Sequence, residues 1–355
     1  LAGCKHQVKR LWMLSMTDQS IKEAFANLRD GEELKPLQDA ARCRSESDWL
    51  VGINGTRAVT IKRSGGRSRQ VSTVGRVQTP TLSLVISREH EIRAFVAKTF
   101  HKITADFQIN EGTYSGVYQR SDFKKNPNDK HDKIDRIWNA DEALSLLSSV
   151  QSSELAQVTE TKKRSPQAAN KLYDLTSLQR EANRLHHLPA SRTLQLAQSL
   201  YEKHKAITYP RTDSKALPED YGPTCSELLG VITGTLATHA QKVLDNGWVD
   251  PKNKKIFNNK QISDHFAIIP TNTPPSNLDA NEAKIYQLIT KRFISVFYPP
   301  AQWDITTRTS LVGEHSFKTE GKVLVEPSWL AIYGKDNQPS DTLPALVADD
   351  EDRAC

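Results

Sequence analysis

The spacing of apolar residues changes period three times along the chain, and this limits the folds open to it. Apolar positions recur at helical spacing over 18–94, alternate like strands over 100–118, return to helical spacing over 174–243, and alternate again over 303–325. An order of helical, β, helical and β segments predicts a multidomain α+β protein. In the first stretch we expect the packed sides of the helices to carry Trp49, Ile53 and Val59 and, further on, Leu82, Val85, Ile86 and Ile92.

Domain boundaries follow from where the period changes. A chain of 355 residues has the length of two or three domains at about 100–200 residues each. Two helices within 174–205 are separated by a Pro-containing break and followed by extended chain, an order that resembles a winged helix. The expected parts are a helical domain at 1–94, a split β-rich domain at 95–162 and 272–335, an inserted winged-helix-like domain at 163–271 and an acidic linker at 336–355.

Charge is distributed unevenly between the body of the chain and its end. The whole chain carries 48 basic and 42 acidic side chains, a net charge of +6. Residues 336–355 contain six acids and one base, so residues 1–335 carry 47 basic and 36 acidic side chains, a net charge of +11. We expect the acidic end to be solvated. A basic body favours a polyanionic partner such as nucleic acid.

Hydrophobic runs and cysteines exclude further classes of protein. The longest apolar runs, such as 267–269, are far shorter than the ~20 residues of a membrane span, which excludes a transmembrane protein. The four cysteines include no C-x-x-C pair, which excludes a zinc ribbon within the sequence and gives no sign of a disulfide framework. This cysteine usage predicts a reducing, cytoplasmic location.

The segment from Ala206 to Ser214 has the densest set of polar side chains. Pro210 disfavours helix at the preceding residue and pushes Tyr209 into extended chain, where Tyr209 and Arg211 point to the same side. A tyrosine oxygen can attack phosphorus if its pKa of about 10 is lowered. A guanidinium nearby both lowers that pKa and neutralises charge on the phosphate. From the residues alone, a packed Tyr209 with Arg211 in a surface ion pair is the alternative.

A second candidate segment runs from Ser263 to Thr271. His265 can donate to a phosphate oxygen or move a proton near neutral pH. Asp264 beside it could orient a neighbouring group. The alternative for this pair is a helix cap or a buried Asp–His contact.

Two more segments carry side chains that suit nucleic acid. Gly75 permits close backbone approach, Arg76 can bind phosphate, and Gln78 can bond to a base edge or a sugar. Gln179 and Asn183 are four residues apart on an expected helix, so one face of it could line a DNA groove. The alternatives are an ordinary loop-to-helix junction and a helix face in water.

Four segments in this order resemble the successive signatures of type IA DNA topoisomerases, and the topoisomerase III branch fits best. They read TVGRVQTP, YDLTSLQREANR, ITYPRTDS and SDHFAIIPT. The stretches KRLWMLSMTDQSI and SDWLVGINGTRAVT are also similar to the family, so the resemblance covers about residues 8–335.

The resemblance implies a role for each matching residue. Tyr209 matches the tyrosine that attacks one DNA strand and keeps the 5′-phosphate as a covalent ester, so the break is resealed without ATP. Arg211 matches the arginine that positions the scissile phosphate, and His265 matches the histidine that bonds to it, while Phe266 stands where many members carry a second His. The expected DNA-binding residues are Thr73 (where the family commonly has Ser), Arg76, Gln78, Gln179, Asn183 and Asp264.

One part of the family pattern has no match in this sequence. The family's N-terminal Toprim domain carries clustered carboxylates that hold Mg²⁺, whereas Asp129, Asp132 and Asp135 are spaced three apart in a polar loop. We therefore expect a fragment of a gated ring, without the Toprim domain and the ring-closing C-terminal segment, that is inactive alone. The resemblance implies a monomer that binds single-stranded DNA for relaxation or decatenation, needs Mg²⁺ held outside this chain, and needs no ATP. We expect no metal site in this chain.

Two other readings of the same residues are open. A non-catalytic remnant that binds single-stranded DNA would use the basic body and its interspersed aromatic residues, although intact Tyr209, Arg211 and His265 argue against it. A tyrosine recombinase would need a dispersed Arg-His-Arg set and a relaxase a His-rich metal cluster, and neither pattern is evident.

Overall fold

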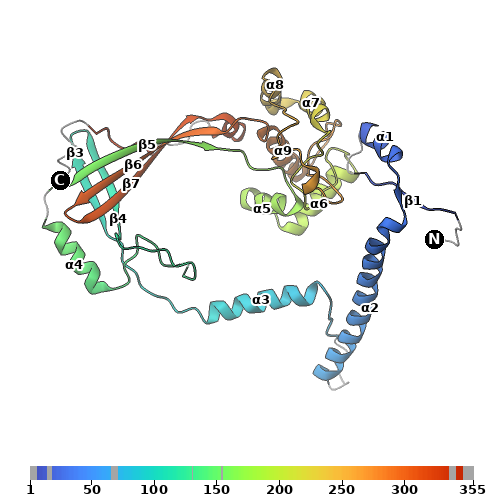
Figure 1. The fold of residues 1–355 in the computed structure, drawn as a ribbon, viewed down its shortest axis with the longest axis horizontal. Coiled ribbons are helices and arrows are strands. Elements are labelled where there is room, and N and C mark those ends of the chain that lie inside the picture. The colour runs from blue at the N-terminus through green and yellow to red at the C-terminus, as the bar shows by residue number, and fades with distance from the viewer. Residues whose placement is uncertain are drawn as a thin grey trace. The chain divides into compact units, whose positions relative to one another are not determined.

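The computed structural model describes residues 6–13, 18–64, 71–129, 131–152, 155–335 and 341–346. The chain divides into two compact units, one formed by Leu1–Met13 and Ile21–Thr99 and the other by Leu14–Ser20 and Phe100–Cys355. Figure 1 labels the helices and strands of each unit. In the described parts of the chain, no helix is both long enough and apolar enough to span a membrane.

The N-terminal part is mainly helical, as the sequence predicted. Two short strands pair antiparallel, with Lys9 opposite Asp30. The elements in chain order are β1 (Lys9–Arg10), α1 (Asp18–Ala26), β2 (Arg29–Asp30), η1 (Glu32–Leu34), α2 (Lys35–Ser64) and α3 (Gln78–Arg93).

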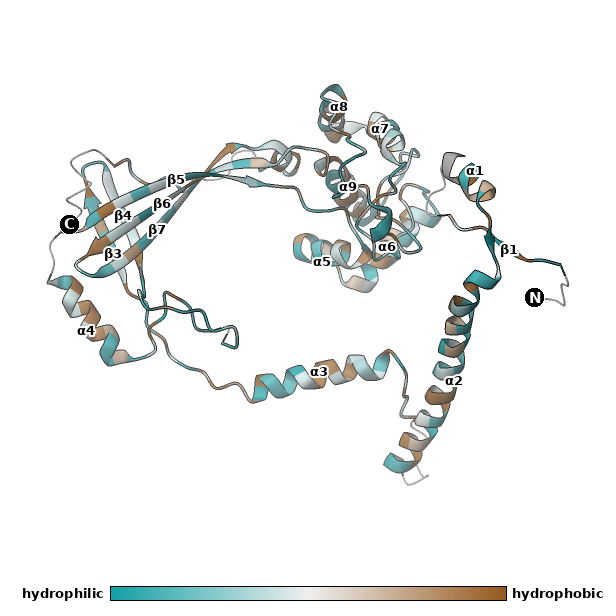
Figure 2. Cartoon of the chain, in the orientation of Figure 1, coloured by the Kyte–Doolittle hydropathy of each residue, from teal (hydrophilic) through white to brown (hydrophobic). Residues whose placement is uncertain are grey.

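The apolar sides of α2 and α3 are not buried within this unit, so the expectation that they are packed is wrong for the chain as it stands. Trp49 on α2 is 65% exposed, and Leu82 and Val85 on α3 are 58% and 61% exposed. Figure 2 shows hydrophobic residues along both helices. Helical spacing indicates that a face is apolar, but it does not indicate which element of the fold covers that face.

The second unit contains a five-stranded antiparallel sheet in the order β3-β4-β7-β6-β5. Strand β6 pairs with β7 through the tight turn at Gly313, whose φ of +59° suits glycine. Phe107, Tyr114 and Phe317 pack on one face of the sheet in the core that α4 covers. The elements are β3 (Thr104–Ile109), β4 (Gly112–Gln119), α4 (Ala140–Gln151), β5 (Gln157–Gln167), β6 (Ala301–Val312) and β7 (His315–Glu326).

Part of the expected acidic linker lies against this sheet. Asp341 exchanges two backbone hydrogen bonds with Lys322 of β7, at 2.9 and 3.1 Å, and the buried Arg308 donates to the carbonyl oxygen of Pro344 at 2.6 Å. Leu343 and Leu346 pack against the same core. Residues 341–346 therefore pack in part against the sheet while Asp341 itself is exposed, and the rest of that stretch lies outside the described residues.

Six helical elements form the remainder of the second unit. The helices expected within 174–205 and near 281–297 are confirmed, and the break between the first two falls at His187–Pro189. The elements are α5 (Leu175–His186), α6 (Ala190–Glu202), α7 (Gly222–Gly230), α8 (Ala237–Asp245), α9 (Ala280–Ser295) and η4 (Ser328–Tyr333), with short 3₁₀ turns η2 (Gly234–Leu236) and η3 (Asn259–Gln261).

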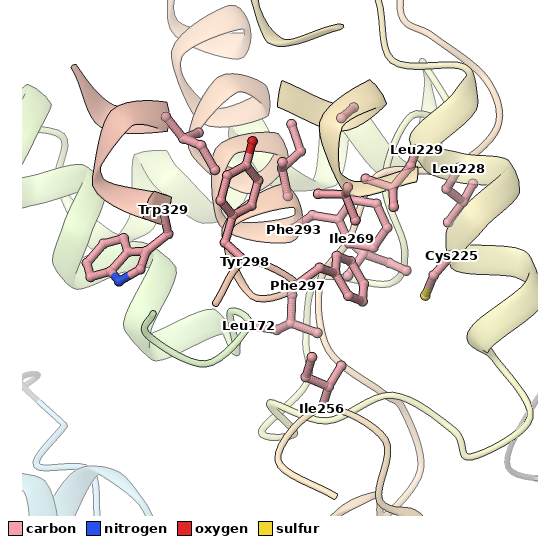
Figure 3. Packing of buried hydrophobic residues seen from close by; sticks show 14 of the residues in the cluster. Leu172, Cys225, Leu228, Leu229, Ile256, Ile269, Phe293, Phe297, Tyr298 and Trp329 are labelled. Carbon is pink, nitrogen blue, oxygen red and sulfur yellow. The ribbon is translucent and has the colours of Figure 1, made fainter. Parts of the chain in front are cut away.

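Helix α9 joins the two hydrophobic cores of this helical group. Ile285 and Ile289 pack with α5 and α6, while Phe293 packs with α7, α8 and Trp303 of β6. Figure 3 shows the second of these cores, in which Phe293 and Phe297 lie beside Ile269. The division of 95–335 into a split β-rich domain and an inserted domain stays a prediction, because residues 100–335 belong to one compact unit and residues 95–99 to the other.

A buried arginine on α9 connects four parts of the helical group. Arg292 is 5% exposed, and its guanidinium donates to Glu181 of α5 and to the backbone carbonyl of Lys171 at 2.9 Å. It also donates to the hydroxyls of Tyr173 at 3.2 Å and Tyr333 at 3.3 Å. Burial raises the pKa of Tyr173, so this hydroxyl stays protonated. Each hydrogen-bonding nitrogen of Arg292 therefore has a partner, which a buried charge requires.

Candidate catalytic site

Two extended segments that lie far apart in the sequence are hydrogen-bonded side by side: the tyrosine segment, 206–214, and the histidine segment, 263–271. Thr208 forms most of the link. Its backbone N–H donates to the carbonyl of Ile269 at 3.0 Å, and its hydroxyl donates to the carbonyl of Ala267 at 2.9 Å and accepts from the N–H of Ile269 at 3.0 Å. The pairing fixes which residues of the two segments face each other.

Apolar residues on both segments hold this pairing in place. Ile207 and Ile268 are buried in the core of α5, α6 and α9, and Ile269 is buried in the neighbouring core. Further along, the hydroxyl of Thr212 donates to the backbone carbonyl of His265 at 2.9 Å. Buried apolar side chains thus anchor the two segments and leave Arg211, Asp264 and His265 at the surface.

The side chain of Tyr209 lies against two other rings. Its ring centroid is 4.3 Å from that of His265, with the planes at 44°. Tyr201 on α6 meets it edge-on, with centroids 5.4 Å apart. Tyr209 is half-buried, so its ring is restrained while the site stays open to solvent. His265 and Asp264 are both exposed beside it.

Arg211 is held by a neutral side chain. With the amide oxygen of Gln198 facing the guanidinium, that oxygen accepts from Nε at 3.2 Å and from Nη2 at 3.0 Å. Among the described residues, no carboxylate lies at ion-pair distance from Arg211, which rules out the surface ion pair considered from the sequence. Arg211 is exposed, and its charge is available to an anionic ligand.

The sequence analysis missed the two α6 residues that contact this site. Tyr209 touches Tyr201 and Arg211 touches Gln198, so both site residues contact the same helix, which fits the shared side that their spacing in extended chain predicted. Gln198 and Tyr201 are three apart and share one face of the helix. That spacing was visible in the sequence, but nothing in it indicated that this face meets the tyrosine segment.

Gln179 and Asn183, expected to bind DNA, have partners inside the fold. The side-chain amide of Gln179 donates to the carbonyl of Ala190 at 3.1 Å, and that of Asn183 donates to the carbonyl of Leu188 at 3.2 Å. The two bonds tie α5 to the first residue of α6 and to the loop before it. A role in DNA binding at these two positions stays a prediction.

We expect Gln179→Ala and Asn183→Ala each to lower the free energy of unfolding of the chain by about 0.5–1 kcal/mol, since each removes one hydrogen bond at an exposed position. Affinity for a single-stranded oligonucleotide should stay within about twofold of wild type. Chemical denaturation and fluorescence anisotropy measure the two quantities. Gln195→Ala, on the exposed side of α6, is the control. A fall in affinity with unchanged stability would instead support DNA contacts at these residues.

The other expected DNA-binding residues, Thr73, Arg76 and Gln78, belong to the first unit and lie where a loop enters α3. Arg76 Nε is 2.6 Å from Asp48 Oδ1 on α2, in an exposed ion pair. The loop is held against α2 by Thr56, whose hydroxyl accepts from the N–H of Val74 at 3.0 Å. Thr73 and Gln78 are exposed. Their role in strand binding stays a prediction.

Metal binding was tested on the side chains present. Within the described residues, no group of three or more His, Cys, Asp or Glu side chains is arranged to hold a metal ion. The donor side chains of the described residues therefore form no cluster that fits Mg²⁺.

The known proteins that this chain resembles are DNA topoisomerases. A family model described as DNA topoisomerase matches residues 32–354. DNA topoisomerase 3 of Bacillus subtilis is 38% identical over 98% of this chain and 47% of its own length, and that of Shouchella clausii is 39% identical over 99% and 46%. The full-length topoisomerase I of Thermotoga maritima matches 94% of this chain and 52% of its own with a TM-score of 0.59 and 22% identity. The chain thus spans about half the length of the relatives it matches.

Proposed function

Because this chain belongs to the type IA DNA topoisomerase family, we propose that it supplies the tyrosine half of an enzyme that breaks and rejoins one strand of DNA without ATP. One observation carries the proposal. The pairing of the tyrosine and histidine segments places Tyr209 against His265, on the same segment as an arginine whose charge no carboxylate of the described residues neutralises. A nucleophile, a group able to donate to a phosphate oxygen and a fixed cation are the components that phosphoryl transfer needs.

In the proposed reaction the phenolic oxygen of Tyr209 attacks the phosphorus of a phosphodiester. The phenol loses its proton, the bond from phosphorus to the 3′-oxygen breaks, and that oxygen takes up a proton. The products are a free 3′-hydroxyl and a 5′-phosphotyrosine, which conserves the bond energy, so the 3′-hydroxyl can attack in reverse and reseal the strand. Arg211 stabilises the charge that builds on the phosphate oxygens. His265 donates a hydrogen bond to the same group.

The substrate and partners follow from this reaction. A single strand must reach Tyr209, so single-stranded DNA is the proposed substrate, bound through its phosphates to a basic body and released as salt rises. Passage of another strand through the break gives relaxation or decatenation. Mg²⁺ is proposed to bind a Toprim domain outside this chain, and the enzyme is proposed to act as a monomer in the cytoplasm, with the isolated chain inactive.

Covalent trapping tests the function. A full-length topoisomerase containing this chain is incubated with a single-stranded oligonucleotide and Mg²⁺ and then denatured with detergent. We expect label at the 3′ end to migrate with the protein and label at the 5′ end to appear in a short free fragment. Binding of the oligonucleotide without any adduct would instead support the alternative of a non-catalytic single-strand-binding protein.

A further inference from the structure

We propose that α6 positions the catalytic pair: Gln198 holds the guanidinium of Arg211, and Tyr201 holds the ring of Tyr209. The inference rests on the proposed function and goes beyond it, because neither α6 residue needs to touch DNA. Each contacts one member of the pair: with its amide oxygen turned toward the guanidinium, Gln198 accepts two hydrogen bonds from Arg211, and Tyr201 lies edge-on to Tyr209.

The geometry of the two elements makes this double contact possible. Residues three apart on a helix share a face, and residues two apart in extended chain share a side. Gln198 and Tyr201 therefore meet Arg211 and Tyr209 in antiparallel order, one α6 residue for each site residue. A displacement of α6 would move both site residues together.

Helix α6 is itself held firmly. Its opposite side carries Leu196, Ala197 and Leu200, which are buried in the core with α5 and α9. Next to Gln198, the hydroxyl of Ser199 donates to Glu282 of α9 at 2.6 Å, and this bond lowers the pKa of the Glu282 carboxyl. A residue on the exposed side of α6 thus projects from a fixed support, which is what a positioning side chain requires.

An amide suits this position better than a carboxylate would. The amide oxygen of Gln198 accepts two of the five N–H donors of Arg211 and leaves three for phosphate oxygens. Because the amide is neutral, it orients the guanidinium without cancelling its charge. A carboxylate in its place would form an ion pair and reduce the attraction between Arg211 and DNA.

The contact with Tyr201 acts on the nucleophile. An edge-on ring at 5.4 Å limits rotation of the Tyr209 side chain, and such a pair contributes about 0.5–1.5 kcal/mol beyond its buried area. Lys205 Nζ lies 5.8 Å from the centroid of the Tyr201 ring. The ring of Tyr201, and not its hydroxyl, makes the contact with Tyr209, so phenylalanine should serve equally well here.

The test measures cleavage by a full-length topoisomerase containing this chain, at saturating oligonucleotide. Gln198→Leu is expected to lower the cleavage rate about tenfold, with oligonucleotide affinity within twofold and an unchanged melting temperature, because loss of preorganisation acts on the rate.

In an Arg211→Ala background, Gln198→Leu should have no further effect. Gln195→Leu, the same change on the exposed side of α6 three residues earlier, should cleave like wild type. Tyr201→Leu should be slow and Tyr201→Phe normal.

The outcomes separate the possibilities. Cleavage at the wild-type rate by Gln198→Leu would overturn the assignment of Gln198. So would a double variant in which the rate losses of Gln198→Leu and Arg211→Ala multiply, because the two residues would then act independently. A parallel loss of stability and rate would show a structural role and overturn it as well. If the unmodified enzyme forms no covalent adduct, the proposed function is wrong. If the unmodified enzyme cleaves and Gln198→Leu cleaves equally well, only the role of Gln198 is wrong.

Discussion

Replacing Tyr209 by phenylalanine should abolish DNA cleavage while leaving single-strand binding intact. The change removes only the hydroxyl oxygen, and the ring contacts with His265 and Tyr201 are made by the ring itself. Loss of a nucleophile costs on the order of four or more powers of ten in rate. Adduct formation by a full-length topoisomerase containing this chain, measured by gel after detergent denaturation, should therefore fall below detection. Anisotropy with the same oligonucleotide should give an unchanged dissociation constant.

The matched control for this prediction is Tyr201→Phe. It makes the same chemical change on the ring next to Tyr209, and we expect normal adduct formation. Relaxation of supercoiled plasmid by Tyr209→Phe at the wild-type rate would mean that another residue is the nucleophile. A loss of oligonucleotide binding in Tyr209→Phe would mean that the hydroxyl contributes to ground-state binding rather than to the chemical step.

The largest effect on stability is expected from Arg292→Ala. This change leaves Glu181 without its buried cation and removes the donor to the hydroxyls of Tyr173 and Tyr333 and to the Lys171 carbonyl. Breaking a buried pair by removing one partner costs about 3–5 kcal/mol. Arg292 connects α9 with α5, with the segment before α5 and with η4. We therefore expect the unfolding transition of the helical group to move to a lower urea concentration. Urea denaturation of the chain, followed by circular dichroism, measures the loss.

Arg184→Ala provides the control, because Arg184 pairs with the same carboxylate. Its side chain is 64% exposed, against 6% for that of Arg292, and the nitrogen–oxygen distance is 3.5 Å. Exposed pairs of this kind contribute about 0–1 kcal/mol. Equal losses in the two variants would show that burial of Arg292 is not what makes its contacts important, and a loss below about 1 kcal/mol in Arg292→Ala would contradict the prediction directly.

Element type was largely predictable from the sequence, and burial was not. The long helices at the start and the two strands β6 and β7 followed from spacing alone, because local hydrogen bonding and side-chain direction depend on neighbouring residues. The exposure of Trp49 could not be predicted, since it depends on what lies against α2. The contact of Pro344 with Arg308 was likewise missed, because a polar, acidic stretch gives no sign of packing on a sheet.

In the candidate site, too, the chemistry of the residues could be predicted from the sequence but their contacts could not. Tyr209, Arg211 and His265 could be selected from their chemistry and from the order of four motifs, and the proline after Tyr209 predicted extended chain. Gln198 and Tyr201 could not be selected, because a glutamine and a tyrosine on an amphipathic helix are compatible with many surroundings. Gln179 and Asn183 were selected for a polar face, but each amide donates to a backbone carbonyl at or just before the start of α6.

By itself, the sequence determined the family of this protein, its helical and β segments and the candidate residues of its site. These depend on residue type and on short spacings, which are local properties. Only the tertiary structure decided that 206–214 pairs with 263–271, so that Tyr209 meets His265, and that α6 lies against Tyr209 and Arg211. Such contacts join residues dozens of positions apart, and they form because the apolar residues beside them are buried in shared cores, which no local pattern specifies.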